Sequence, residues 1–298
     1  MAAVVCFGLG YSARHWAAGF GHGIDRIVGT VRSPQRAAAF VATPRGATAV
    51  ETIVFDGVTP SPELRARLDE ATVVLVSAPP GASGDPVLGA FGGALPAPRL
   101  ELAIYLSTVG VYGDHAGGAV DEATPAQPAS PRSKARLAAE LAWQRLGGQA
   151  GLPVAVLRLA GIYGPGQNAL VTLQEGRARR VVKPGQVFNR IHVADIGQAI
   201  AAAIARKADG IFNVADDEPS PPQDVIAFAA RLLGVEPPPE VPFAEAAGDM
   251  SPMALSFYDE NKRVLNHRLG AELGVRLRYP TYREGLRALH AEMSAGGA

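Results

Sequence analysis

The sequence predicts an α/β protein with a doubly wound parallel sheet and a smaller C-terminal α/β part. Three observations support this prediction. Short apolar runs alternate with helical stretches through the first half of the chain. The run Val73–Val76 is wholly apolar, as expected for a strand that is covered on both faces. A glycine-containing turn directly follows the first apolar run, and a helical stretch follows that turn.

The predicted elements follow from periodicity and composition. The stretch Lys134–Leu146 is rich in Ala, Leu, Arg and Glu, which favour a helix. Gly234 is a normal stop for the amphipathic stretch before it. Strands are expected at residues 4–7, 26–31, 49–55, 73–76, 103–106, 154–159 and 211–214. Helices are expected at residues 12–20, 34–41, 134–146, 196–204, 222–233, 261–273 and 282–293.

The length of the chain favours one main domain with an appendage, because 298 residues are many for one small domain and few for two large ones. We expect the main domain over residues 1–165, with a later segment at about 190–215 that returns to it. The smaller part is expected over residues 166–189 and 216–298.

Charge and cysteine content exclude several classes of protein. Lys plus Arg equal Asp plus Glu at 28 each, so the chain has no broad basic field for nucleic acid or an anionic membrane. Cys6 is the single cysteine, so no intrachain disulfide is expected. No segment approaches the length of a membrane span, and no metal site is predicted. We therefore expect a cytoplasmic protein without nucleic-acid or membrane partners.

The N-terminal glycine turn predicts a ligand. Gly8 ends the first predicted strand and Ser12 opens the first helix, so free amide groups and the positive helix end face the turn. Gly10 permits close approach of a phosphate, and Ala13 stands at the third position of the G-x-G-x-x-G/A fingerprint. Together with Tyr11, these residues predict a Rossmann-type cradle for the pyrophosphate of a dinucleotide. The alternative is an ordinary glycine turn.

The end of the second strand indicates which dinucleotide is bound. NAD-selective proteins place an acid about 20 residues after the glycines, where it binds the ribose 2′-hydroxyl. Here the segment contains Thr30, Arg32 and Ser33, with Arg36 one turn further on, and no acid. A guanidinium group and a hydroxyl suit a 2′-phosphate, so we expect NADP rather than NAD. The alternative is that Arg32 is an ordinary surface arginine.

Two further strand ends are expected to contact the cofactor, because ligands of such sheets lie at the carboxyl ends of the strands. Asp56 ends the third strand and is expected to meet the adenine amino group. Ser77, Ala78 and Pro79 end the fourth strand and are expected to run beside the ribose. In each case the alternative is a plain loop.

Five stretches carry further motifs in a fixed order: 107–113 reads STVGVYG, 121–125 is acidic, 158–166 ends in YGPG, 190–196 contains IHVAD, and 261–286 closes the chain. Together they resemble the extended short-chain dehydrogenase/reductases, the NAD-dependent epimerase/dehydratase group. The resemblance covers nearly the whole chain. It implies hydride transfer between a bound nicotinamide cofactor and an oxygen-bearing carbon of a small, sugar-like substrate.

In that family a tyrosine four residues before a lysine gives or takes the proton, and a Ser or Thr hydroxyl holds the substrate oxygen. Thr108 matches the hydroxyl and Lys134 the lysine, but Ser130 stands at the tyrosine position. A serine cannot replace a phenol without an adjacent base. Lys134 then either holds the ribose or is an exposed lysine at a helix start. Tyr112 or Tyr163 supplies a phenol instead, unless both rings pack at strand ends.

The second half departs from the family in one further place. The arginine expected before the IHV motif is replaced by Phe188, with Arg190 two places later, which puts a nucleotide-sugar substrate in doubt. His192 is interpreted as structural and Asp195 as a helix cap. The remaining cations available to a substrate phosphate are Arg177, Arg179, Arg180 and Lys183.

Two functions remain open at this point. The first is an NADP-dependent oxidoreductase or epimerase/dehydratase-like enzyme. The second is a non-catalytic NADP-binding regulator that senses redox state, which the missing tyrosine suggests. A homodimer that pairs through the helix starting near Lys134 is a further expectation from the resemblance.

Overall fold

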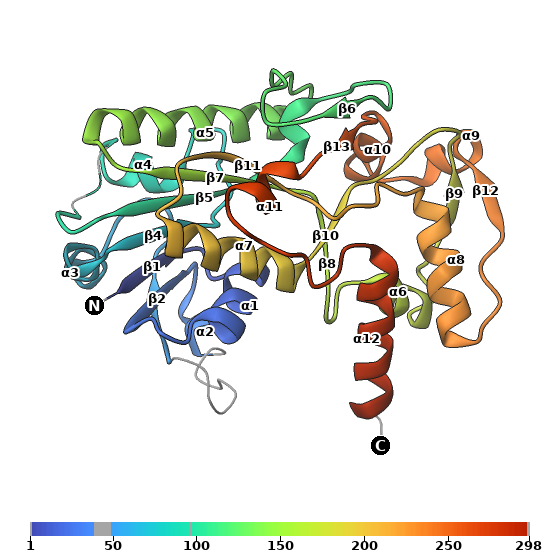
Figure 1. Cartoon of the computed structure of the whole chain (residues 1–298), viewed down its shortest axis with the longest axis horizontal. Helices are drawn as coiled ribbons and strands as arrows, with labels where there is room; N and C mark the ends of the chain where they lie inside the picture. The colour runs from blue at the N-terminus through green and yellow to red at the C-terminus, as the bar shows by residue number, and fades with distance from the viewer. Residues whose placement is uncertain (1, 39–48, 94, 96, 297–298) are drawn as a thin grey trace.

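The computed structural model of the chain describes residues 2–38, 49–93, 95 and 97–296 (Figure 1). Its centre is a seven-stranded parallel sheet with the strand order β3-β2-β1-β4-β5-β7-β11. The strands are β1 (Ala3–Phe7), β2 (Arg26–Val31), β3 (Val50–Val54), β4 (Val73–Val76), β5 (Leu102–Thr108), β7 (Val154–Leu159) and β11 (Gly210–Val214). The predicted α/β class with a doubly wound parallel sheet is confirmed.

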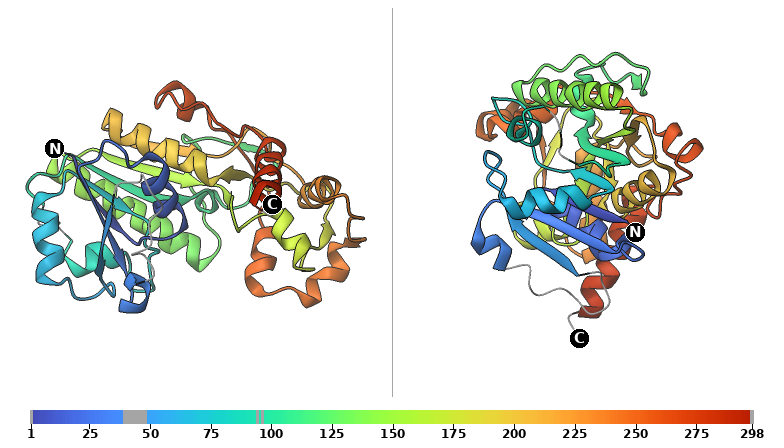
Figure 2. Two further views of the ribbon diagram at one scale, coloured as in Figure 1. Left: turned by 90° about the horizontal axis from the view of Figure 1, so that it is seen from below. Right: turned by 90° about the vertical axis from the view of Figure 1, so that its left-hand side faces the viewer.

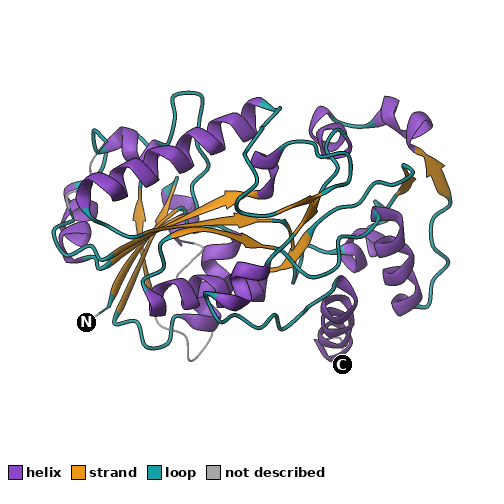
Figure 3. Cartoon of the chain, turned by 45° about the horizontal axis from the view of Figure 1, so that its top comes forward, coloured by secondary structure: helices purple, strands orange, loops and turns teal. Residues whose placement is uncertain are grey.

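Helices cover both faces of this sheet (Figure 3). One face carries α1 (Tyr11–Phe20), α7 (Val193–Arg206) and α11 (His267–Ala271). The other face carries α3 (Pro62–Glu70), α4 (Pro86–Ala90) and α5 (Pro131–Ala150). A short helix, α2 (Pro34–Ala38), follows β2. Every residue of β4 and β7 is buried, which explains why their sequences are apolar along their whole length apart from one arginine in β7.

The smaller part lies beside the carboxyl ends of the strands (Figure 2). It contains the strand pair β9 (Arg180–Val182) with β12 (Glu240–Pro242). At its border β8 (Gly161–Tyr163) pairs with β10 (Arg190–His192), and both strands lie outside the predicted bounds of 166–189 and 216–298. A third pair joins β6 (Ala119–Val120) to β13 (Arg263–Val264). Its helices are α6 (Ala169–Gln174), α8 (Pro222–Leu233), α9 (Phe243–Ala246), α10 (Pro252–Tyr258) and α12 (Tyr282–Gly296). Two 3₁₀ turns are η1 (Val109–Tyr112) and η2 (Ala247–Asp249).

The structure departs from the expected elements in a few places. The helix expected at 261–273 is wrong in its first part, because residues 263–264 form β13 and pair with β6, so that only 267–271 are helical. Helix α5 begins earlier than expected, since Ser130 caps it and Pro131 occupies its first turn. Helices α3, α4 and α6 were not predicted. The helix expected at 34–41 is described only as far as residue 38, and the rest lies outside the described residues.

A buried ion pair joins the sheet to α5. Glu140 of α5 and Arg158 of β7 meet at 2.8 Å, and their side chains are 1% and 4% exposed. The hydroxyl of Ser107, on β5, donates to the same carboxylate. The guanidinium group of Arg158 also lies 4.7 Å from the ring of Tyr112, whose hydroxyl donates to Asn213 on β11. This network fixes α5 and η1 against three neighbouring strands.

We expect Arg158→Met to lower the free energy of unfolding by about 3–5 kcal/mol, because it leaves the carboxylate of Glu140 buried without a partner. The double variant Glu140→Leu with Arg158→Met removes both charges and should recover most of that loss. Urea unfolding at neutral pH measures both. A loss below about 1 kcal/mol in the single variant would show that the pair does not hold α5 in place.

Helix α7 begins at His192, whose Nδ1 accepts a hydrogen bond from the amide of Ala194 at 3.1 Å. Burial lowers the pKa of His192 to about 4, so the ring is neutral at pH 7. The expectation that Asp195 caps this helix is therefore wrong. The carboxylate of Asp195 accepts the amides of Arg278 and Tyr279, at 2.6 and 3.1 Å. It ties the segment before α12 to the sheet domain.

The neutral ring of His192 makes stability depend on pH. The unfolded chain takes up a proton below its ordinary pKa of about 6.5, whereas the folded ring resists protonation until about 4. The neutral ring therefore makes its full contribution to the free energy of unfolding above the unfolded pKa. That contribution is lost as the pH falls from the unfolded pKa toward the folded one. We expect His192→Asn, which keeps an acceptor for the cap, to lose less unfolding free energy than the native chain between pH values of about 7.5 and 4.5. The exposed His22→Asn is the control, and equal losses in all three proteins would contradict this account.

Candidate functional site

The loops at the carboxyl edge of the sheet hold the predicted site residues. Strand β1 lies between β2 and β4, so the sheet order changes direction beside β1. Ligands of doubly wound sheets bind in the crevice at such a switch point. The turns after β1, β2, β4 and β5 all open at this edge (Figure 1).

Gly8 is required where β1 meets this edge. Its φ is +90°, and a Cβ at this position would lie 2.9 Å from the backbone nitrogen of Ala78. Its amide donates to the hydroxyl of Thr30 at 2.9 Å, and the amide of Leu9 donates to the carbonyl of Thr30 at 2.8 Å. Thr30 is buried, so its hydroxyl shapes the glycine turn from the end of β2.

The N-terminus of α1 points into the same crevice with its amides available. Gly10 is the cap residue, and no described side chain accepts from the first-turn amides. Ser12 and Ala13 are buried beneath the turn. A Cβ on Gly10 would lie 3.8 Å from the hydroxyl of Ser77, which places Ser77 against the turn. Unused helix amides beside a glycine fit the pyrophosphate of a dinucleotide.

Tyr11 closes one side of this crevice. Its hydroxyl donates to the carbonyl of Pro165 at 3.0 Å, and its ring lies 4.3 Å from that of His15. Burial raises the pKa of Tyr11 to about 12. The side chain therefore acts as a neutral bridge between the glycine turn and the turn that follows β8.

The end of β2 presents a free cation. Arg32 is exposed, and within the described ranges no residue forms an ion pair with it. The hydroxyl of Ser33 accepts from the amide of Arg36 at 3.4 Å, and Arg36 is exposed as well. No carboxylate occurs between Thr30 and Arg36. The arrangement fits a phosphate better than a ribose hydroxyl at this position.

Asp56 and the segment 77–79 lie at the ends of β3 and β4, as the sequence suggested. Asp56 accepts the amides of Val58 and Thr59 at 2.8 and 3.1 Å, and these hydrogen bonds hold its pKa below the usual range. The amides of Ser77 and Ala78 both donate to the carbonyl of Phe7, which keeps this segment against β1. Pro79 is exposed.

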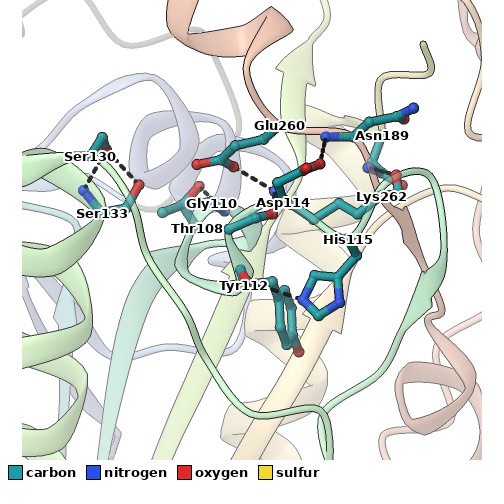
Figure 4. A network of polar contacts seen from close by, with 12 residues as sticks. Thr108, Gly110, Tyr112, Asp114, His115, Ser130, Ser133, Asn189, Glu260 and Lys262 are labelled. Carbon is teal, nitrogen blue, oxygen red and sulfur yellow. Dashed lines mark hydrogen bonds and ion pairs between the residues drawn. The ribbon is translucent and has the colours of Figure 1, made fainter.

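Three hydroxyl groups gather where β5 ends and α5 begins (Figure 4). Thr108 accepts the amide of Gly110 at 3.1 Å. Ser130 donates to the hydroxyl of Ser133 at 2.9 Å and accepts its amide at 3.1 Å. A Cβ on Gly110 would lie 3.2 Å from the hydroxyl oxygen of Ser133 and 3.4 Å from that of Thr108. Glycine at this position therefore leaves both hydroxyls open to the same space.

Ser133 was not predicted as a site residue. It is buried and stands one position before Lys134. The only signal in the sequence is the spacing Ser130-x-x-Ser133, which is typical of a helix cap. Lys134 is exposed and has no hydrogen-bond or ion-pair partner among the residues that the structure describes. A role for Lys134 in holding ribose stays a prediction.

Both alternative phenols are buried, and their hydroxyl groups already donate hydrogen bonds to other residues. Tyr112 is fully buried, its hydroxyl donates to Asn213 at 2.8 Å, and burial raises its pKa. Tyr163 donates to the carbonyl of Thr281 at 3.4 Å, and burial raises its pKa as well. Both rings pack at strand ends. His192 is neutral and occupied with the start of α7, so it is structural.

A buried lysine that the sequence analysis did not single out lies beside η1 (Figure 4). Lys262 donates to the carbonyl of Gly113 at 2.6 Å and to the carboxylate of Glu260 at 2.5 Å. Its side chain is 6% exposed. Asn189, directly before β10, donates to the carbonyl of Lys262 at 3.0 Å. No local spacing reveals this contact, because it joins Gly113 to a residue far along the chain.

Two further features bear on the class of protein, namely possible metal ligands and possible membrane-spanning helices. Among the described residues no group of His, Cys, Asp or Glu could hold a metal ion. Within the same ranges no helix is both long and apolar enough to cross a membrane.

The chain is similar to several known proteins. Residues 94–215 match the model of the NAD dependent epimerase/dehydratase family. A 3-diazoavenalumate denitrifying reductase from Streptomyces sp is 30% identical over 180 residues, 56% of this chain and 55% of the relative. Protein YeeZ of Escherichia coli K12 is 35% identical over 147 residues, 47% of this chain and 49% of the relative. The chain thus spans about half the length of these curated relatives in the alignments.

Solved structures match over almost the full length. A conserved protein of unknown function from Silicibacter pomeroyi is 47% identical with a TM-score of 0.88, covering 98% of this chain and 99% of that one. DesIV, a dTDP-glucose 4,6-dehydratase from Streptomyces venezuelae with NAD and TYD bound, has a TM-score of 0.77 at 17% identity. It covers 99% of this chain and 97% of its own, and at this identity it shows the fold alone. The motif segment of residues 107–113 lies inside the matched region, so the resemblance to the NAD dependent epimerase/dehydratase family is confirmed over residues 94–215.

Proposed function

We propose that this chain is an NADP-dependent oxidoreductase that reduces, or oxidises, an oxygen-bearing carbon of a small substrate. The observation that carries the proposal is the position of three hydroxyls, on Thr108, Ser130 and Ser133, at the same sheet edge as the glycine turn. When bound, the nicotinamide supplies or accepts the hydride. The chain itself binds, orients and handles the proton.

The preference for NADP is supported by the end of β2. Relatives of known structure are solved with NAD, as the DesIV complex states. In this chain Arg32 and Ser33 stand where a carboxylate would favour NAD, and Arg32 is free of ion pairs with the described residues. A fixed guanidinium group recognises a phosphate through two parallel hydrogen bonds.

Reduction is supported over dehydration by the composition of η1. Loss of water from a sugar requires an acid and a base near adjacent carbons. Between Thr108 and Tyr112 the turn holds only Val109, Gly110 and Val111, none of which titrates. Among the relatives described above, the reductase therefore offers a better parallel for the chemistry than the dehydratase DesIV does.

The proton moves along hydroxyls in this account. Thr108 gives its proton to the substrate oxygen as hydride arrives at carbon, and recovers one from Ser133, which Ser130 and then water replenish. A serine hydroxyl does not ionise near pH 7, so the three hydroxyls pass a proton from one to the next and none of them holds a negative charge.

The substrate is proposed to be small and without a diphosphate. Phe188 packs 5.2 Å from Tyr258 and 6.4 Å from Phe257, and Phe257 is 51% exposed. Aromatic surface thus occupies the place where the family resemblance implies an arginine. The smaller part, residues 166–189 and 216–298, is proposed to bind this substrate. We also propose a homodimer that pairs through α5, and a cytoplasmic location.

Arg32→Asp tests the cofactor. The change places a carboxylate against the 2′-phosphate, so we expect NADP affinity to fall by about 10–100-fold while NAD affinity falls little or rises. Calorimetric titration of both cofactors measures this. Arg99→Asp is the matched control, because Arg99 is also exposed but precedes β5 at the other end of the sheet. Tighter binding of NAD than of NADP by the native chain, or an unchanged NADP affinity in Arg32→Asp, would refute the preference.

Thr108→Val tests the chemistry. The native protein, loaded with NADPH, is screened against aldehydes, ketones and sugar nucleotides. With a substrate found, Thr108→Val and Ser133→Ala should each lower kcat by about 10²–10⁴-fold, because the proton path is interrupted. Thr108→Ser keeps the hydroxyl and should restore most of the rate, and NADPH affinity should not change in any variant. NADPH binding without turnover on all three substrate classes would overturn the enzyme and leave a binding protein.

A further inference from the structure

A cavity in the smaller part lies away from the hydroxyl cluster. It has a volume of about 260 Å³ and is lined from β8, β10, α6, α8 and α12. None of the residues predicted for the cofactor lines it, and neither do Thr108, Ser130 or Lys134. This volume is slightly below the ~300 Å³ at which pockets for drug-sized ligands begin, so it fits one ring or a short chain.

The polar end of this cavity is Arg190. Its Nη1 donates to the carbonyl of Phe188 at 3.0 Å and to the carbonyl and hydroxyl of Ser220 at 3.1 and 2.8 Å. No described residue accepts a hydrogen bond from Nε or Nη2 of the same guanidinium group. Burial lowers the pKa of Arg190, yet an arginine stays charged in proteins. The side chain is therefore a fixed cation whose Nε and Nη2 donors remain available to a ligand.

The carboxyl groups near this cation leave its spare donors unoccupied. Asp216 is buried and interacts electrostatically with Arg190, but no hydrogen bond joins the two side chains, and the Oδ2 of Asp216 has no hydrogen-bond partner among the described residues. Burial raises the pKa of Asp216 to about 8. Glu218 is engaged in an ion pair with Arg283. The spare donors of Arg190 therefore fit an incoming carboxylate.

The rest of the lining is mostly apolar. Tyr163 and Tyr282 offer ring faces, and Val225, Ile226 and Leu286 offer aliphatic surface. At the rim stands Arg179, whose side chain is 45% exposed and approaches a carboxylate, that of Asp249, only at 3.8 Å. The cavity therefore combines a cationic end with a hydrophobic body.

We propose that this cavity binds a small organic monocarboxylate with an apolar body, such as an aromatic acid. The carboxylate lies against the fork of Arg190, with Arg179 closing the entrance, and the ring lies between α8 and α12. A planar guanidinium group matches a carboxylate through paired hydrogen bonds. The site needs neither the cofactor nor the hydroxyl cluster. A test of carboxylate binding is therefore independent of a test of the proposed activity.

Benzoate is the probe, and benzyl alcohol, which has the same ring without the charge, is its matched control. Calorimetric titration of the full chain should show benzoate binding at least about tenfold more tightly than benzyl alcohol, because a charged hydrogen-bonded pair is lost in the alcohol. Arg190→Gln should weaken benzoate binding by about tenfold or more. Arg179→Gln should weaken it less, and Arg177→Gln, which changes an exposed arginine of the same loop outside the cavity, should have no effect.

Ile226→Trp provides a second route if Arg190→Gln fails to fold. The indole ring fills the cavity from α8 without touching a charge, and it should abolish benzoate binding while the circular dichroism spectrum stays native. Equal binding of benzoate and benzyl alcohol, no binding of benzoate at millimolar concentration, or undiminished binding in Ile226→Trp would each overturn the proposal.

Discussion

The buried pair of Glu140 and Arg158 is the contact on which the candidate site depends. It joins α5 to β7 inside the fold, and Ser107 adds β5 to the same carboxylate. Ser107 directly precedes Thr108, and Glu140 lies on the helix that Ser130 caps. The distance between the hydroxyls of β5 and those of α5 is therefore set by an ion pair that touches neither. A site whose groups must meet within a few tenths of an ångström gains from such rigid support.

The cofactor side of the site is more complete than the catalytic side. The cofactor side has each part that a dinucleotide needs: a glycine with positive φ, free amides at a helix start and a cation at the end of β2. The catalytic side has serine at the position of the family's tyrosine, and the two other tyrosines that the sequence offered are buried. What remains are hydroxyls and a buried ammonium group that is paired with the carboxylate of Glu260. The hydroxyls suit the orientation and protonation of an alkoxide.

Much of the fold could be predicted because apolar runs and the glycine turn are local signals. The strands of the sheet and the place of the cofactor loop follow from residues near each other in sequence. Contacts between distant segments could not be predicted this way. Residues 261–264 look helical in isolation, but β13 pairs with β6 and Asn189 binds their backbone. Likewise His192, not Asp195, caps α7, because Asp195 is drawn to the amides of residues 278 and 279.

The residues that were missed share one property: their surroundings come from other parts of the chain. The role of Ser133 depends on its position beside Gly110, and that of Lys262 on its position beside Gly113. Arg190 was named from the sequence as an available cation, but its place between α6, α8 and α12 could not be predicted. The most direct measurement of the central claim is a crystal structure of the complex with NADP. The account predicts the pyrophosphate on the amides of residues 11–13, the 2′-phosphate against Arg32, and the hydroxyls of Thr108 and Ser133 nearest to the nicotinamide C4. A nicotinamide that lies away from Thr108, facing another titratable side chain, would contradict it.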